Sequence, residues 1–390
     1  MSLKEWWNKL AYTETRSNAH FRIADDHIID THDPGQASQF VAGATYFEVR
    51  LNQMFLRNQR EYFREFVPLA SVMTEFQFAG RRLRVPIVLG PALLGDIEKV
   101  GQGDRVEFLN VRLLGPCPYE GEDVELFIGL FRMVTADWAK RAVSLLESLT
   151  KIMDASKLST ALNVAGPLVD GVQGFIGMKD LEARLAQYIH YATPGLDTVP
   201  ASGALRPGFE VLIREPAEPV DEKARRRFWV REGRLFHGES AEHSSEYTGS
   251  DFVLYSIMPL SARHDYATFP FHTTYWKRVE ELLAAQKNDE AIENFKLLAA
   301  DLVRCDDIVY PHRLALLQNY RKRMDEAVAL YSGLFSDLGA TRGAPASRGM
   351  LQVQAGQAPL GELDLGRAVE QAARVDLSPE RALAEATRFA

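Results

Sequence analysis

The residues best suited to chemistry gather near the N-terminus. The segment from 20 to 33 carries seven imidazole or carboxylate side chains, at His20, Asp25, Asp26, His27, Asp30, His32 and Asp33. These groups supply the nitrogen and oxygen ligands that Zn²⁺, Mn²⁺ and iron take in proteins. In an extended chain His27 and His32 face opposite sides, and in a helix they lie about 140° apart. The chain would therefore have to bend between them for both to bind one ion. A turn at Asp33-Pro34-Gly35 could supply this bend.

Two hypotheses follow for this segment. In the first, His20, Asp26, His27 and His32 are the ligands of a metal-dependent hydrolase. In the second, the segment is a solvated acidic stretch that leads into the first strand. The second requires no bend, and we expect no cofactor.

Other catalytic motifs are absent from the sequence. GESAE at 238–242 lacks the second glycine of a nucleophile elbow. GVQGFIGMKD at 171–180 lacks the Gly-Lys-Ser/Thr ending of a phosphate-binding loop. Cys117 lies between two prolines with no basic neighbour in sequence to lower its pKa, so we expect an inert thiol. The sequence therefore favours a protein that is not an enzyme.

The composition indicates a globular protein of two or three domains. The chain has 390 residues, of which 46% are hydrophobic and 25% charged. A formal charge of −8 argues against nucleic-acid binding, because phosphate contacts need a basic face. Two cysteines cannot form a disulfide framework, and no apolar stretch follows Met1, so we expect a cytoplasmic protein. The Arg- and Ala-rich C-terminus suggests a bacterial source.

Residues 41–273 have the pattern of an α+β domain. Alternation at Phe47, Val49 and Leu51, and a hairpin pattern around Ala79-Gly80, predict an antiparallel β sandwich or curled sheet over 41–134. Gly115-Pro116-Cys117-Pro118 should interrupt that sheet, because proline lacks a backbone donor. A helical insertion is expected over about 135–190. Strands return at 209–213, 228–237 and 252–260.

One segment of the insertion is long and apolar enough to raise a membrane hypothesis. Residues 158–178 carry a single charge, Asp170, over a length that would span a bilayer. Pro167, Asp170 and four glycines make insertion costly and spoil a stable helix. We expect a buried helix–loop–helix here, and a membrane-inserting segment is the alternative.

The C-terminal part contains a short internal repeat. Adding 36 to the positions of an apolar set, Ala291, Ile292, Phe295, Leu298 and Leu302, gives a second one, Ala327, Val328, Tyr331, Leu334 and Leu338. The segments DEAIENF and DEAVALY resemble the second helix of tetratricopeptide repeats, over about 274–338 only. The resemblance implies two helix–turn–helix pairs that bind a peptide or another protein on a concave face. The alternative is a two-hairpin cap that only covers a sheet.

The whole sequence therefore predicts four parts. Residues 1–40 form a terminal helix and an extended segment, 41–273 the β-rich domain, 274–338 the helical repeats, and 339–390 a linker with a docking tail. We expect a scaffold or interaction component whose partner is another protein or a peptide. The candidate partner-binding residues are the large apolar side chains of the repeats, namely Trp276, Val279, Leu283, Tyr310 and Tyr320.

Overall fold

A computed structural model describes most of the chain. The described residues are 3–5, 18–29, 39–56, 60–61, 64–89, 106–134, 158, 181–193, 203–214 and 220–340. The chain divides into two compact units, unit 1 (Met1–Leu260) and unit 2 (Ser261–Ala390). Residues 6–17 of the expected terminal segment, 135–157 and 159–180 of the expected helical insertion, and the tail after Ala340 lie outside the described residues.

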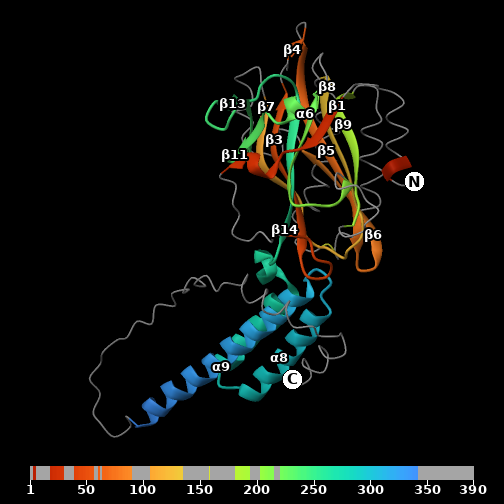
Figure 1. Cartoon of the computed structure of the whole chain (residues 1–390). Coiled ribbons are helices and arrows are strands. Elements are labelled where there is room, and N and C mark those ends of the chain that lie inside the picture. The colour runs from red at the N-terminus through yellow and green to blue at the C-terminus, as the bar shows by residue number, and fades with distance from the viewer. Residues whose placement is uncertain are drawn as a thin grey trace. The chain divides into compact units, whose positions relative to one another are not determined.

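The first sheet of unit 1 joins strands from both ends of that unit. Its order is β1 (Asn18–Arg22), β10 (Gly208–Arg214), β14 (Phe252–Leu260), β3 (Tyr46–Leu56) and β7 (Val106–Pro118), with every pair antiparallel (Figure 1). The three central strands, β10, β14 and β3, are buried on both faces, which explains their nearly continuous apolar sequences. β10 and β14 lie far from β3 in the sequence, and they join it in this sheet because β10 pairs with β14 and β14 pairs with β3.

The second sheet is antiparallel and contains a tight hairpin. Its order is β4 (Arg60–Glu61), β5 (Arg64–Phe78), β8 (Val124–Val134) and β9 (Leu181–Tyr191), and β6 (Arg81–Leu89) also pairs with β5. The predicted hairpin between β5 and β6 is confirmed. Its two turn residues, Ala79 and Gly80, have φ of 50° and 69°, as a two-residue turn of this hand requires.

A small third sheet completes unit 1. It contains β2 (Ile28–Ile29), β11 (Phe228–Arg231), β12 (Arg234–Gly238) and β13 (Ser244–Glu246), with β2 parallel to β11. Two short helices flank it, η1 (Asp25–His27) and α6 (Glu222–Arg225).

Two buried clusters show which faces pack. One draws side chains from β3, β10 and β14 and from β5, β6, β8 and β9 of the second sheet. The other joins the opposite face of the first sheet to the third sheet through residues such as Phe21, Phe209 and Phe228. The described chain is therefore α+β with antiparallel sheets around shared apolar cores.

Two sequence expectations for unit 1 are corrected. Gly115–Pro118 do not end the ladder, since Cys117 pairs with Phe47 and Pro118 with Tyr46. β7 is the last strand of its sheet among the described residues, and the register shifts beside it, so the missing proline donor is tolerated. Leu181–Tyr191, expected in the helical insertion, form β9 because Leu185, Ile189 and Tyr191 alternate into the core.

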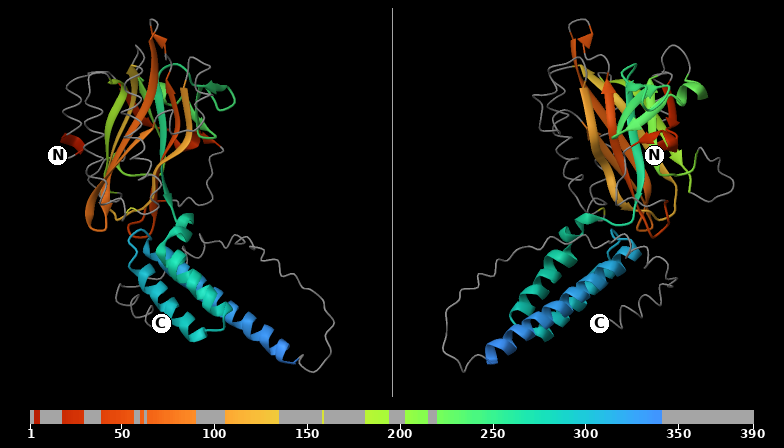
Figure 2. Two further views of the ribbon diagram at one scale, coloured as in Figure 1. Left: turned by 180° about the vertical axis from the view of Figure 1, so that it is seen from behind. Right: turned by 60° about the vertical axis from the view of Figure 1, so that its left-hand side comes forward.

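Unit 2 is helical. It contains η4 (His264–Thr268), the π-helix η5 (Phe271–Trp276), α7 (Lys277–Ala284), α8 (Asn288–Val303) and α9 (Tyr310–Ala340). The helices predicted around 276–283 and 288–302 are confirmed. Figure 2 shows that α9 extends well beyond α7 and α8, as expected for 31 residues against 16 in α8.

The segment expected to hold the second helix–turn–helix pair lies within one helix, α9. The turn between α7 and α8 is made at Gln286, with φ of 59°, whereas the position 36 residues later, Lys322, lies inside the continuous helix α9. Two ion pairs support the helix there, Arg321–Asp325 at 3.4 Å and Lys322–Glu326 at 3.8 Å, because residues four apart lie side by side on a helix.

Candidate functional site

Four polar side chains from four strands meet inside unit 1, and we call them the buried tetrad: His20, Tyr191, Glu210 and Tyr255. His20 lies on β1, Tyr191 on β9, Glu210 on β10 and Tyr255 on β14. The strand register brings them together, since Glu210 is the pairing partner of Tyr255 and His20 is opposite Leu212. Alternation then turns all four toward the core shared by the two large sheets.

The tetrad is closely packed around one carboxylate oxygen. Glu210 Oε2 accepts hydrogen bonds from Tyr191 Oη at 2.7 Å and from Tyr255 Oη at 2.9 Å. His20 Nε2 lies 2.8 Å from the same oxygen and 2.8 Å from Tyr255 Oη. The two phenol oxygens are 2.8 Å apart. The four groups therefore form one connected network.

Burial and charge set the protonation of the network. Burial alone would raise the pKa of Glu210, but the hydrogen bonds and charge of His20 and the two phenol donors hold it below its usual value. Burial, and then the charge of Glu210, raise the pKa values of Tyr191 and Tyr255 well above 10.0. The carboxylate is thus ionised and the phenols are protonated. His20 is the member that reaches solvent, with 22% of its side chain exposed.

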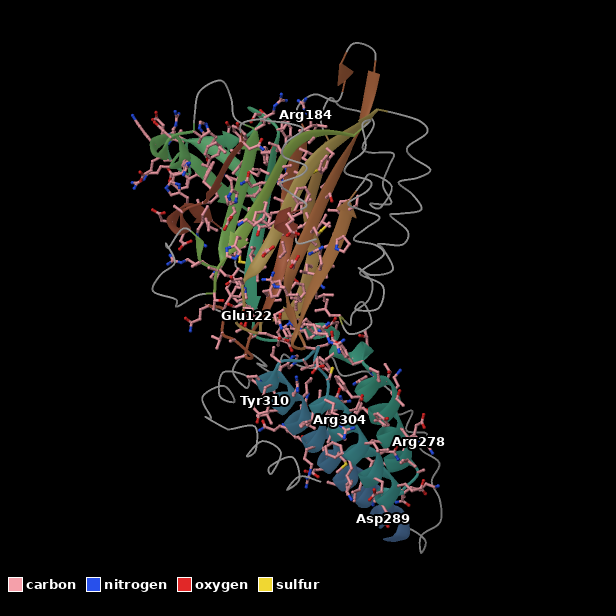
Figure 3. The ribbon with its side chains drawn as sticks, turned by 90° about the vertical axis from the view of Figure 1, so that its right-hand side faces the viewer. Glu122, Arg184, Arg278, Asp289, Arg304 and Tyr310 are labelled. Carbon is pink, nitrogen blue, oxygen red and sulfur yellow. The ribbon has the colours of Figure 1, made fainter. Side chains whose placement is uncertain are left out.

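Further polar contacts also link β9 to the first sheet. Arg184 of β9 (Figure 3) pairs with Asp251 at 3.0 Å, and both are almost fully buried. Arg214 is a further partner of Asp251 at 3.5 Å. Asn18 of β1 donates to the backbone oxygen of Ala186 at 3.1 Å. These contacts compensate the buried charges of Arg184 and Asp251 and join β9 to the first sheet.

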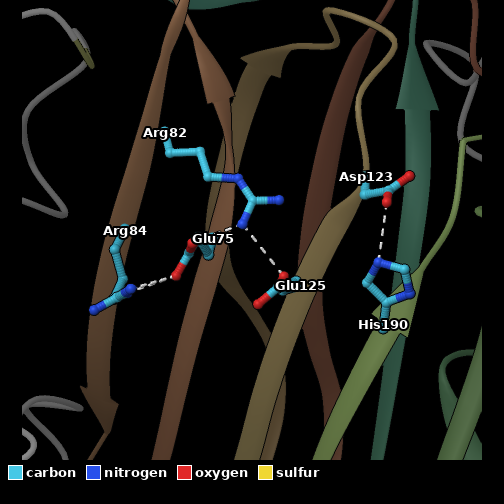
Figure 4. A network of polar contacts seen from close by, with 6 residues as sticks. All are labelled: Glu75, Arg82, Arg84, Asp123, Glu125 and His190. Atoms are coloured by element: carbon cyan, nitrogen blue, oxygen red, sulfur yellow. Dashed lines mark hydrogen bonds and ion pairs between the residues drawn. The ribbon is translucent and has the colours of Figure 1, made fainter. Parts of the chain in front are cut away.

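A second polar network lies on the other face of the second sheet (Figure 4). Glu75 contacts Arg84 at 2.5 Å and Arg82 at 3.1 Å, and Arg82 reaches Glu125 at 3.4 Å. Two buried carboxylates are therefore balanced by two guanidinium groups. This balance leaves no net charge to attract a ligand, and we assign the network a structural role.

Figure 4 also shows a histidine–carboxylate pair, Asp123 and His190, 3.0 Å apart. Burial would raise the pKa of Asp123, but hydrogen bonds from Thr193 and the nearby His190 lower it. Thr193 donates to Asp123 through its backbone nitrogen at 2.9 Å and through Oγ1 at 3.0 Å. The pair joins β8 to the end of β9.

The predicted metal cluster is corrected. His27 stacks on Trp229, with ring centroids 3.9 Å apart, while Asp26 is exposed and His32 lies outside the described residues. His20 instead points into the tetrad, because β1 pairs with β10 while the residues after it join β11. Over the part of the chain that the structure describes, no three His, Cys, Asp or Glu side chains gather as ligands.

The predicted partner-binding residues are also corrected. Trp276, Val279, Leu283 and Tyr320 are at most 2% exposed and form the core of unit 2. Trp276 and Tyr320 contact each other, with ring centroids 4.7 Å apart. Tyr310 is half-buried. A unit of three main helices has no other core, so its largest apolar side chains fill the interior and are not available to a partner.

The membrane hypothesis concerns residues that the structure describes at one position only. Leu158 is half-buried against the core of unit 1, and 159–178 lie outside the described residues. In the described helices, none is long and apolar enough to cross a bilayer.

Comparison with known proteins adds no relative. No family model, no curated protein and no solved structure matches this chain. The resemblance to tetratricopeptide repeats therefore stays a prediction.

Sequence reasoning singled out His20 but missed the other three members of the tetrad. Each of them lies at an inward-facing position of a strand. A charged residue such as Glu210, inside the apolar run GFEVLIR, is the signal that could have found it, since buried charge requires partners.

Proposed function

We propose that the protein is a non-enzymatic interaction component that binds another protein along the C-terminal half of α9. One observation carries this proposal. His312 and Leu330 are eighteen residues apart, which is five turns at about 3.6 residues per turn, so they lie on the same face of the helix. His312 is 0% exposed, whereas Leu330 is 61% exposed.

The packing of unit 2 explains this difference. The 16 residues of α8 and the 8 residues of α7 are too short to cover the whole of α9, which has 31. They bury its first half, through Leu316 and Tyr320. Covering a large apolar side chain such as Leu330 removes it from water and is therefore favourable. Single exposed leucines are nevertheless common on protein surfaces.

The proposed partner is an apolar face of a helix or peptide. The charged residues that precede Leu330 are paired within α9, as Arg321–Asp325 and Lys322–Glu326, so the surface carries no net charge there. Apolar contact, rather than charge, would select the partner. In this proposal the two large sheets of unit 1 form a β sandwich that serves as the scaffold. Cys117 and Cys305 are not joined in a disulfide, which supports a reducing, cytoplasmic location.

A photo-crosslinking amino acid placed at 330 of the full chain tests the proposal in cells. The matched control is position 329, where Ala329 is also exposed but lies about 100° away around the helix. We expect a crosslinked protein from 330 and none from 329. With that protein purified, Leu330→Glu should weaken binding about tenfold or more, which is about 1.4 kcal/mol.

Ala329→Glu should leave the affinity within about twofold. The proposal is wrong if the two positions crosslink equally, or if both substitutions change the affinity by the same factor.

A further inference from the structure

We propose that the buried tetrad is a binding site for a ferric ion, with His20 Nε2, Glu210 Oε2, Tyr191 Oη and Tyr255 Oη as its ligands. This site is independent of the helical surface of unit 2. It keeps His20, a ligand candidate from the sequence, but replaces all of the partners that the sequence suggested.

The spacing of the donor atoms is the first argument. Five distances among the four donors lie between 2.7 and 2.9 Å. First-row metal ions bind nitrogen and oxygen ligands at about 2.0–2.2 Å, so neighbouring ligands of an octahedral ion are about 2.8–3.1 Å apart. The donors therefore need little rearrangement to surround an ion.

The pattern of these distances also fits an octahedron. Tyr255 and Glu210 are close to each other and to both of the remaining donors. In an octahedron this arrangement makes His20 and Tyr191 opposite ligands. It leaves two neighbouring positions, which water or a small anion would fill.

The donor chemistry selects a hard trivalent ion. Two phenolates and one carboxylate supply three negative charges, which balance Fe³⁺, and the neutral imidazole supplies the nitrogen ligand. Structural Zn²⁺ sites favour thiolate and imidazole ligands, and Ca²⁺ and Mg²⁺ sites are built from oxygen ligands alone. No thiol or second imidazole belongs to the tetrad.

Binding exchanges protons for metal charge. In the metal-free network both phenols donate their protons to Glu210 Oε2, and His20 Nε2 lies 2.8 Å from the same oxygen. Binding of Fe³⁺ at these four atoms would displace the two phenol protons and the proton between His20 Nε2 and Glu210, and all of them would pass to solvent. A bound cation reverses the effect of burial on its ligands in this way.

The surroundings allow access and support the ligands. His20 is the partly exposed member of the tetrad and marks the side from which an ion can enter. Arg22, two residues further along β1, has a positive charge that favours the ionised form of Tyr191. Asn18 and Arg22 both bond to backbone oxygens, of Ala186 and Pro207, which fixes the two ends of β1 beside the site.

Visible spectroscopy of the full-length protein tests the proposal directly. Ferric nitrilotriacetate is added to metal-free protein, and the absorbance of a tyrosinate-to-iron charge-transfer band is followed to its end point. We expect a band that saturates at one iron per chain. Tyr191→Phe and Tyr255→Phe should each weaken the band by half or more.

Tyr247→Phe is the matched control, because Tyr247 is in the same unit but bonds to Ser250 at 3.0 Å and not to the tetrad. It should leave the band unchanged. Since Tyr255 is fully buried and its variant could unfold, His20→Gln, at the partly exposed ligand, is measured in parallel with circular dichroism on every variant. It should lower the affinity for iron at least tenfold.

Two results would overturn the proposal. The first is a folded wild-type protein with no charge-transfer band at saturating ferric nitrilotriacetate. The second is a band that persists unchanged in both tyrosine variants and in His20→Gln, which would place the iron elsewhere.

Discussion

Acid should selectively destabilise unit 2 through His312. This side chain is 0% exposed, and burial lowers its pKa from 6.5 to about 3. The charges of Arg263 and His264 lower the pKa further, and Asp265 opposes them. Native His312 therefore stays neutral at mildly acidic pH. In the unfolded chain the same imidazole takes up a proton below about pH 6.5.

The sign and size of the effect follow from linkage. Between the two pKa values the unfolded state binds more protons, so stability is complete above about pH 6.5 and is lost as the pH falls toward 3. At 1.36 kcal/mol per pKa unit, the free energy of unfolding should fall by about 2 kcal/mol between pH 7 and pH 5. His272 adds in the same direction, because burial and the charges of Arg323 and Lys277 lower its pKa as well.

Urea titrations at pH 7 and pH 5, followed by a brief deuterium pulse and mass spectrometry of peptides from α8 and α9, measure this quantity for unit 2. His312→Leu should lose most of the pH dependence. Each variant is compared with itself at the two pH values, so its own loss of packing cancels. His243→Gln, at an exposed histidine of unit 1, should keep the wild-type dependence. An unchanged dependence in His312→Leu would refute the reasoning.

Two further substitutions test the packing. Gly115→Ala should destabilise unit 1 more than Gly43→Ala does. Both glycines have positive φ, so both substitutions strain the backbone. A Cβ at 115 would also lie 2.7 Å from the backbone oxygen of Phe47, whereas a Cβ at 43 would have nothing within 4 Å. Urea unfolding measures both, and equal losses would contradict the predicted clash. Trp276→Ala should cost about 3–5 kcal/mol in unit 2, while Leu330→Ala changes stability by less than about 0.5 kcal/mol. Similar values for these two would show that Trp276 is not a core residue.

The strands and helices could be predicted where apolar residues recur at a regular spacing. Phe47, Val49 and Leu51 alternate because one face of β3 meets the shared core, and local pattern alone carries that information. The hairpin at Ala79-Gly80 is equally local. The continuation of β7 through Pro118 could not be predicted from local pattern. A strand tolerates proline where no neighbour needs its backbone donor, and among the described strands β7 pairs with β3 alone.

The candidate sites depend on information that is not local. His20 contacts a tyrosine 235 positions away, and Tyr191 contacts one 64 positions away. The pairing of β1 with β10 and of β10 with β14, and the contact of β9 with β1 and β10, bring these residues together. In unit 2 the apolar spacing indicated the buried face of α8, at Ala291, Phe295, Leu298 and Leu302. Trp276 looked like a surface anchor, and it is the largest side chain of the core.

The central position of β14 constrains how unit 1 is made on the ribosome. β14 is the last strand of the unit to be synthesised, yet it lies between β10 and β3 in the first sheet. Until residue 260 has left the exit tunnel, β3 and β10 both lack their shared neighbour and expose unpaired strand edges. We expect nascent chains that end before β14 to be bound by chaperones and to aggregate when released, because their sheet cannot close.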